Sequence, residues 1–71
     1  MIDRSTIQEL LEREPFEPFR IHLSDGHIYE VVNPSVVVPM MSKMFIALPD
    51  DRWKFLSYSH VTRIEGQEIA A

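Results

Sequence analysis

The most constraining feature of this sequence is a change of hydrophobic period at Phe19. From Phe19 onward, apolar and polar side chains alternate, and a turn signal recurs about every eight to ten residues. Alternation is typical of strands with one buried face, so this part of the chain predicts several short β-strands. Asp25-Gly26 marks the first hairpin turn, because glycine accepts a positive φ without a steric penalty. Further turns are predicted at Ser42-Lys43 and at Pro49-Asp50-Asp51.

The segment before the strands has a helical period instead. Ile7, Leu10 and Leu11 form a single apolar stripe at helical spacing. Pro15 ends this pattern, because proline lacks a backbone donor and disfavours helical geometry at the residue before it. We therefore expect a helix over residues 3–14. A helix this short is marginal in water, so it must pack on the strands.

The whole chain of 71 residues is expected to form one domain. The predicted fold is mainly β with one N-terminal α-helix. Residues 18–65 are expected to form a small, strongly bent antiparallel barrel of five strands, of the Sm/SH3-like type. Closure is expected because a barrel removes exposed strand edges. Residues 66–71 are expected to form a frayed tail.

Composition excludes several classes of protein. The chain has no cysteine, so disulfides and thiol chemistry are absent. It has no apolar run of the roughly 18 residues that a spanning helix needs and no basic-then-apolar signal peptide. A formal net charge of −4 argues against strong non-specific attraction to nucleic acid or anionic membranes. We expect a cytoplasmic protein that does not act at a membrane.

Candidate catalytic and metal-binding residues are few. His22, His27 and His60 lack a third ligand at a recognisable metal spacing, and the acidic pair Asp50-Asp51 lies in a predicted turn. The sequence has no nucleophile elbow, no phosphate-binding loop and no dinucleotide fingerprint. These absences predict a non-catalytic protein with no metal and no cofactor.

Self-association is predicted from apolar residues that a small barrel cannot cover. Residues 36–41 and 44–48 are apolar on both alternating faces. One face can fill the barrel, and the other needs either the helix or a second copy of the chain. Pairing of edge strands between copies of the chain would cover the strand edges and the apolar faces together. Such copies could form a closed ring or an open assembly. The expected interface residues are Val37, Phe45, Trp53 and Phe55.

The order of elements resembles that of the Sm-like small-barrel family, and Hfq-type bacterial RNA chaperones most of all. Residues 18–26 (PFRIHLSDG) resemble the family's first strand and turn, residues 44–48 (MFIAL) its third strand, and residues 58–62 (YSHVT) its closing Tyr-Lys-His motif. The longer stretch EPFEPFRIHLSDG, residues 14–26, is also similar to one found in small uncharacterised bacterial proteins. The resemblance implies a non-catalytic binding or assembly module that forms homo-oligomers.

The resemblance also implies an alternative function, RNA binding in a uridine-type pocket. The positions that match the family's pocket residues are Gln8, Phe45, Tyr58 and His60. Two positions depart from the pattern: Met44 replaces a glutamine that contacts the base, and Ser59 replaces a lysine. The second change removes a charge-assisted donor.

The position of the charge favours assembly over RNA binding. Residues 1–18 have a net charge of −3, whereas residues 19–64 have a net charge of +1. In a six-fold ring the helical segments would place a net charge of about −18 on the face where the family's uridine pocket opens. The electric field of that charge would repel RNA. RNA therefore stays a possible but disfavoured partner, and the leading hypothesis is a self-associating module.

Overall fold

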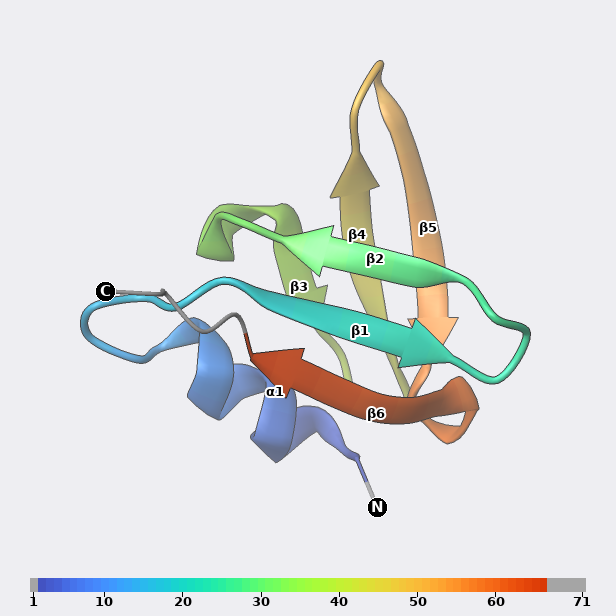
Figure 1. The fold of residues 1–71 in the computed structure, drawn as a ribbon, viewed down its shortest axis with the longest axis horizontal. Helices are drawn as coiled ribbons and strands as arrows, with labels where there is room; N and C mark the ends of the chain where they lie inside the picture. The colour runs from blue at the N-terminus through green and yellow to red at the C-terminus, as the bar shows by residue number, and fades with distance from the viewer. Residues whose placement is uncertain (1, 67–71) are drawn as a thin grey trace.

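The structure, a computed structural model, describes residues 2–66 and is mainly β (Figure 1). In chain order the elements are α1 (Arg4–Leu11), β1 (Phe19–Leu23), β2 (Ile28–Val31), the 3₁₀ helix η1 (Pro34–Val36), β3 (Val37–Pro39), β4 (Lys43–Leu48), β5 (Arg52–Ser57), the 3₁₀ helix η2 (Tyr58–His60) and β6 (Val61–Gly66). The predicted combination of one N-terminal helix with short strands is confirmed. The end of the predicted tail, residues 67–71, lies outside the described residues.

Helix α1 is shorter than the predicted helix over residues 3–14. Asp3 is its N-cap, and the Asp3 carboxylate accepts hydrogen bonds from the Ser5 hydroxyl at 2.7 Å and the Thr6 backbone N–H at 3.1 Å. These bonds, that of Ser5 first, hold the pKa of Asp3 below its ordinary value. The helix ends at Leu11. Pro15 explains this end, because a proline cannot bond to the carbonyl four residues earlier and clashes with it.

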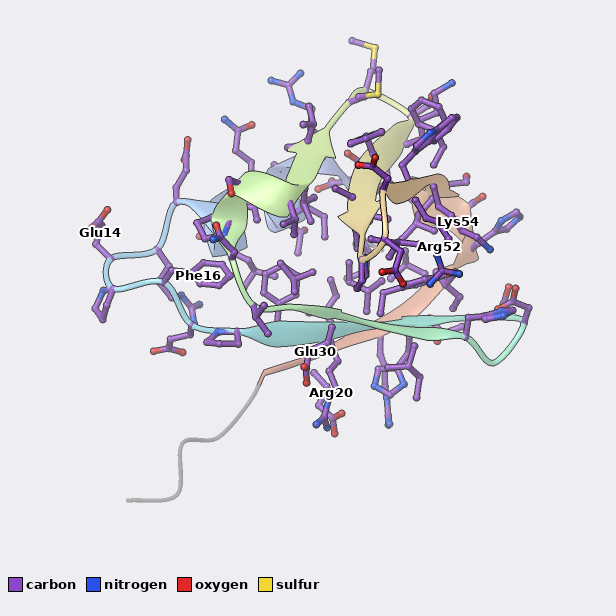
Figure 2. All side chains as sticks on the ribbon, turned by 90° about the horizontal axis from the view of Figure 1, so that it is seen from above. Glu14, Phe16, Arg20, Glu30, Arg52 and Lys54 are labelled. Atoms are coloured by element: carbon purple, nitrogen blue, oxygen red, sulfur yellow. The ribbon has the colours of Figure 1, made fainter. Side chains whose placement is uncertain are left out.

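The first sheet has the strand order β2-β1-β6, and both of its pairings are antiparallel. The β1–β2 turn is the predicted Asp25-Gly26 turn, with Gly26 at φ 94° and its N–H donating to the Leu23 carbonyl at 3.0 Å. Arg20 on β1 lies across from Glu30 on β2, and Figure 2 shows both side chains on the outer side of this sheet. The inner side faces the rest of the molecule.

The second sheet has the strand order β3-β4-β5, also antiparallel. Its β4–β5 hairpin projects away from α1 in Figure 1. The turn of this hairpin places Asp50 and Asp51 at positive φ, 65° and 64°. Aspartate is one of the few residues other than glycine that visits this region, which suits the predicted turn at these residues.

The predicted five-stranded closed barrel is wrong. The described residues form six strands in two three-stranded sheets, and no barrel closes. The chain leaves the first sheet after β2 because the Asn33 side chain accepts a hydrogen bond from the Ser35 N–H at 2.9 Å and starts η1. Pro34 cannot donate to a ladder, which reinforces the break. The 3₁₀ helix η2 likewise separates β5 from β6, and these two strands do not pair.

A single core lies between the two sheets and the helix. Its buried side chains come from α1, from η2 and from all six strands: Ile7, Phe19, Ile21, Val31, Val37, Met44, Ile46, Leu56, Tyr58 and Val61. The connector after the helix contributes as well. Phe16 packs on Phe19 with ring centroids 6.1 Å apart, while Figure 2 shows Glu14 at the outer edge of the same loop. The stiff connector thus ties the helix to β1.

Candidate functional site

The most distinctive surface of the described chain is the outer face of the β3-β4-β5 sheet. Phe45 lies opposite Val38 on one side and opposite Phe55 on the other, and Trp53 lies two residues before Phe55. Because side chains alternate along a strand, these four residues project from the same side of the sheet. We call Val38, Phe45, Trp53 and Phe55 the aromatic face.

The three rings of the aromatic face form one cluster. Phe45 and Trp53 are stacked, with centroids 6.0 Å apart and an interplanar angle of 25°. Phe55 meets Phe45 edge-on at 5.8 Å and meets Trp53 edge-on at 5.4 Å. Such offset and T-shaped contacts are favourable and fix the orientation of each ring. The face is therefore preorganised, with little side-chain freedom left to lose on binding.

This cluster is accessible although it is apolar. Trp53 is 57% exposed and Phe55 is 49% exposed. The Lys43 ammonium lies 5.1 Å from the centroid of the Phe55 ring, close enough for a cation–π contact. Small soluble domains rarely leave a contiguous apolar patch open without a use for it.

Three of the four interface residues predicted from the sequence lie on the aromatic face, and Val37 does not. Val37 is 4% exposed and packs in the core, whereas Val38 is 52% exposed. The prediction for Val37 is corrected because β3 begins with an inward position, so the next residue is the outward one. Val38 and Lys43 were missed. The alternation of β3 and β4 would have identified both once Phe45 was assigned to the outer face.

The four positions matched to the family's RNA pocket lie in four different surroundings within one chain. Gln8 lines a shallow groove beside α1 and Met41, and its amide donates to Glu12 at 3.3 Å. Phe45 belongs to the aromatic face. Tyr58 is buried, and His60 lines a separate cleft between β5 and the β1–β2 turn.

Tyr58 has a structural contact that accounts for its burial. Its hydroxyl donates to the Met40 carbonyl at 2.6 Å, which links η2 to the β3–β4 turn. Burial raises the pKa of the Tyr58 hydroxyl, and the bond to Met40 only partly opposes that rise. Tyr58 therefore stays a neutral donor at physiological pH, and its hydroxyl is already used inside the chain.

The other two histidines form contacts with nearby carboxylates. His22 Nε2 lies 3.2 Å from Glu65, and this hydrogen bond is the main reason that the pKa of Glu65 is lowered. His27 Nδ1 lies 2.9 Å from Asp25 across the β1–β2 turn. Among residues 2–66, no group of three or more His, Cys, Asp or Glu side chains could hold a metal ion. The same part of the chain has no helix long and apolar enough to cross a membrane.

Comparison with known proteins identified no relative of this chain. The chain matches no protein-family model, no curated protein and no solved structure. Inferences about function therefore start from the chain's own surfaces.

Proposed function

We propose that this protein is a non-catalytic assembly module that associates with a second copy of itself through the aromatic face. The observation that carries the proposal is the ordered cluster of Phe45, Trp53 and Phe55 on the outside of a sheet. Aromatic residues are enriched at the centres of protein interfaces, where they dominate the binding energy. Within residues 2–66, Lys43 is the one charged side chain that the strand alternation places on this face of β3, β4 and β5.

The area of the face suits a small homodimer. An aromatic side chain offers about 150–250 Å², so half-exposed Trp53 and Phe55 leave roughly 100 Å² each. With Val38, Phe45 and the surrounding sheet, one chain presents roughly 400 Å². Two copies stacked face to face would bury somewhat under 1,000 Å², which is near the lower limit of specific interfaces. The expected complex is therefore reversible, with a Kd in the micromolar range.

Association through the face is favoured over pairing of the β5 edge. Arg52 and Lys54 lie on this edge strand, and both are exposed. Charged side chains on an edge strand oppose the addition of another strand, because two copies would bring like charges together. The aromatic face has no such barrier, so it is the preferred surface for a second copy.

The test is the mass of the Trp53→Ser variant on a sizing column with light scattering. Wild-type protein should have the mass of a dimer or larger assembly at tens of micromolar, and the variant should have the mass of a monomer. Removing a central aromatic residue from an interface costs about 2 kcal/mol or more, a change of about 30-fold in Kd. Ile28→Ser is the matched control, because Ile28 is 55% exposed on the other sheet.

Two outcomes would contradict the proposal. A wild-type monomer at the highest soluble concentration would remove the basis of the proposal, and equal dissociation by Ile28→Ser would show that the aromatic face is not the interface.

RNA binding is measured in parallel by fluorescence anisotropy with short uridine-rich and adenine-rich RNA at low salt. A net charge of −4 predicts no binding. Binding that Phe45→Ala abolishes would instead assign the face to single-stranded RNA.

A further inference from the structure

A second surface lies where the two sheets separate, and Phe55 is the one residue that it shares with the aromatic face. It is a cleft of about 160 Å³ between the β1–β2 turn and the end of β5, lined by Leu23, Asp25, Tyr29, Lys54, Phe55, Leu56, Ser57 and His60. The backbone N–H of Ser24 donates to the His60 carbonyl at 2.8 Å, which holds the turn against η2 and sets the width of the cleft.

Lys54 brings a positive charge to this cleft. It lies two residues before the buried Leu56 and opposite the buried Ile46, so the alternation of β5 turns it toward the other sheet. Its ammonium lies 6.0 Å from the Tyr29 ring. No carboxylate of the described residues forms an ion pair with Lys54. Arg52, two residues earlier on β5, does not line the cleft, and its guanidinium donates instead to the Pro49 carbonyl at 3.4 Å.

The one carboxylate that lines the cleft is bonded to a neighbouring residue. Asp25 accepts from the His27 backbone N–H at 2.9 Å, and His27 Nδ1 lies 2.9 Å from its other oxygen. The backbone bond is the main cause of the lowered pKa of Asp25. Asp25 is therefore ionised and opposes an anion in the cleft, but it does not neutralise Lys54 by contact.

Two further polar residues, Ser57 and His60, complete the lining. Ser57 lines the cleft, and its hydroxyl lies 2.9 Å from the Ser59 hydroxyl. When Ser59 donates in this bond, the Ser57 proton is free to turn toward a ligand. His60 brings a second side chain that can donate a hydrogen bond. A lysine with nearby hydroxyl and imidazole groups is a donor set suited to a small oxyanion.

We infer that this cleft binds a small oxyanion, a phosphate or a carboxylate, with Lys54 as the main charged contact. The size of the cleft limits the ligand. A volume of about 160 Å³ corresponds to roughly five water molecules, enough for a phosphate or a short carboxylate but too small to enclose a nucleotide. The inference does not depend on self-association, because the cleft is built within one chain.

The experiment is a titration with inorganic phosphate followed by amide chemical shifts in NMR spectra, with sodium chloride keeping the ionic strength constant. Shifts should concentrate at Tyr29, Lys54, Ser57 and His60. Lys54→Gln should weaken phosphate binding about fivefold, because one favourable charge at short range is lost. Asp25→Asn should strengthen it by a similar factor, since it removes the opposing charge and keeps a side-chain oxygen for the turn.

Opposite effects of these two variants separate ligand binding from general damage to the fold. Arg13→Gln is the charge-matched control, and it should leave phosphate affinity unchanged. Arg13 pairs with Glu17 in the connector before β1, whereas the cleft lies at the turn after β1. A parallel titration with acetate distinguishes a carboxylate ligand from phosphate, and localised shifts with either anion support the site. Shifts spread over the whole surface, or equal affinity of wild type and Lys54→Gln, would overturn the inference.

Discussion

Replacing Phe19 with alanine is expected to remove about half of the stability of this domain. Phe19 starts β1, the central strand of its sheet, and it is fully buried between β2 and β6. Truncating a buried phenylalanine costs about 3–5 kcal/mol, because the lost burial is added to the cost of a cavity. Domains have about 0.05–0.15 kcal/mol of stability per residue, so a chain of this length has roughly 4–11 kcal/mol.

Urea denaturation followed by far-ultraviolet circular dichroism measures this loss as a fall in the midpoint. Ile28→Ala is the control, because Ile28 lies on the same sheet but is exposed, and it should cost less than about 1 kcal/mol. A Phe19→Ala variant that lost no more than this control would show that β1 does not organise the core.

The change of hydrophobic period at Phe19 was sufficient to predict a mainly β chain with one N-terminal helix, but not its architecture. Alternation after Phe19 and the Asp25-Gly26 turn correspond to β1, β2 and their hairpin. These features depend on local physics, namely side-chain period and the freedom of glycine at positive φ. The N-terminal helix was predictable for the same reason, although it ends at Leu11 rather than near Pro15.

Closure of the strands into one barrel was not predictable from the same signals. Asn33-Pro34 can bend a strand or end it, and the residue types are the same in both cases. The outcome depends on whether the ladder of backbone hydrogen bonds continues past the bend. Here the Asn33 side chain bonds to the Ser35 N–H and the chain turns into η1, so two sheets form.

The candidate interface was partly predictable for a related reason. Phe45, Trp53 and Phe55 were named from the sequence as expected interface residues, and in the structure their rings form one cluster. Val37 and Val38 could not be separated, because a run of valines has no polar residue to mark the outer face. A shift of one residue exchanges the two faces of a strand, and only the register with β4 decides between them.

Replacing Ile7 with alanine is expected to detach the helix from the sheets. Ile7 is the one residue of α1 that is fully buried, and Leu10 and Leu11 are only partly buried. Losing a buried isoleucine side chain costs about 2–5 kcal/mol. An isolated helix of eight residues is unstable in water, so a helix without this contact should unfold locally before the strands do.

Hydrogen exchange of the backbone amides distinguishes local from global loss. In Ile7→Ala, protection should fall most over residues 4–11, and β1 and β4 should keep more of theirs. Glu9→Ala is the control on the exposed side of the helix, and it should leave protection nearly unchanged. Equal loss of protection in every strand of Ile7→Ala would show that α1 is part of one cooperative unit. The same variant should also change how the protein associates. Helix α1 packs against β3, so detaching the helix should uncover one edge of the sheet that bears the aromatic face. The variant should therefore form larger, less defined assemblies, whereas Trp53→Ser should yield monomers.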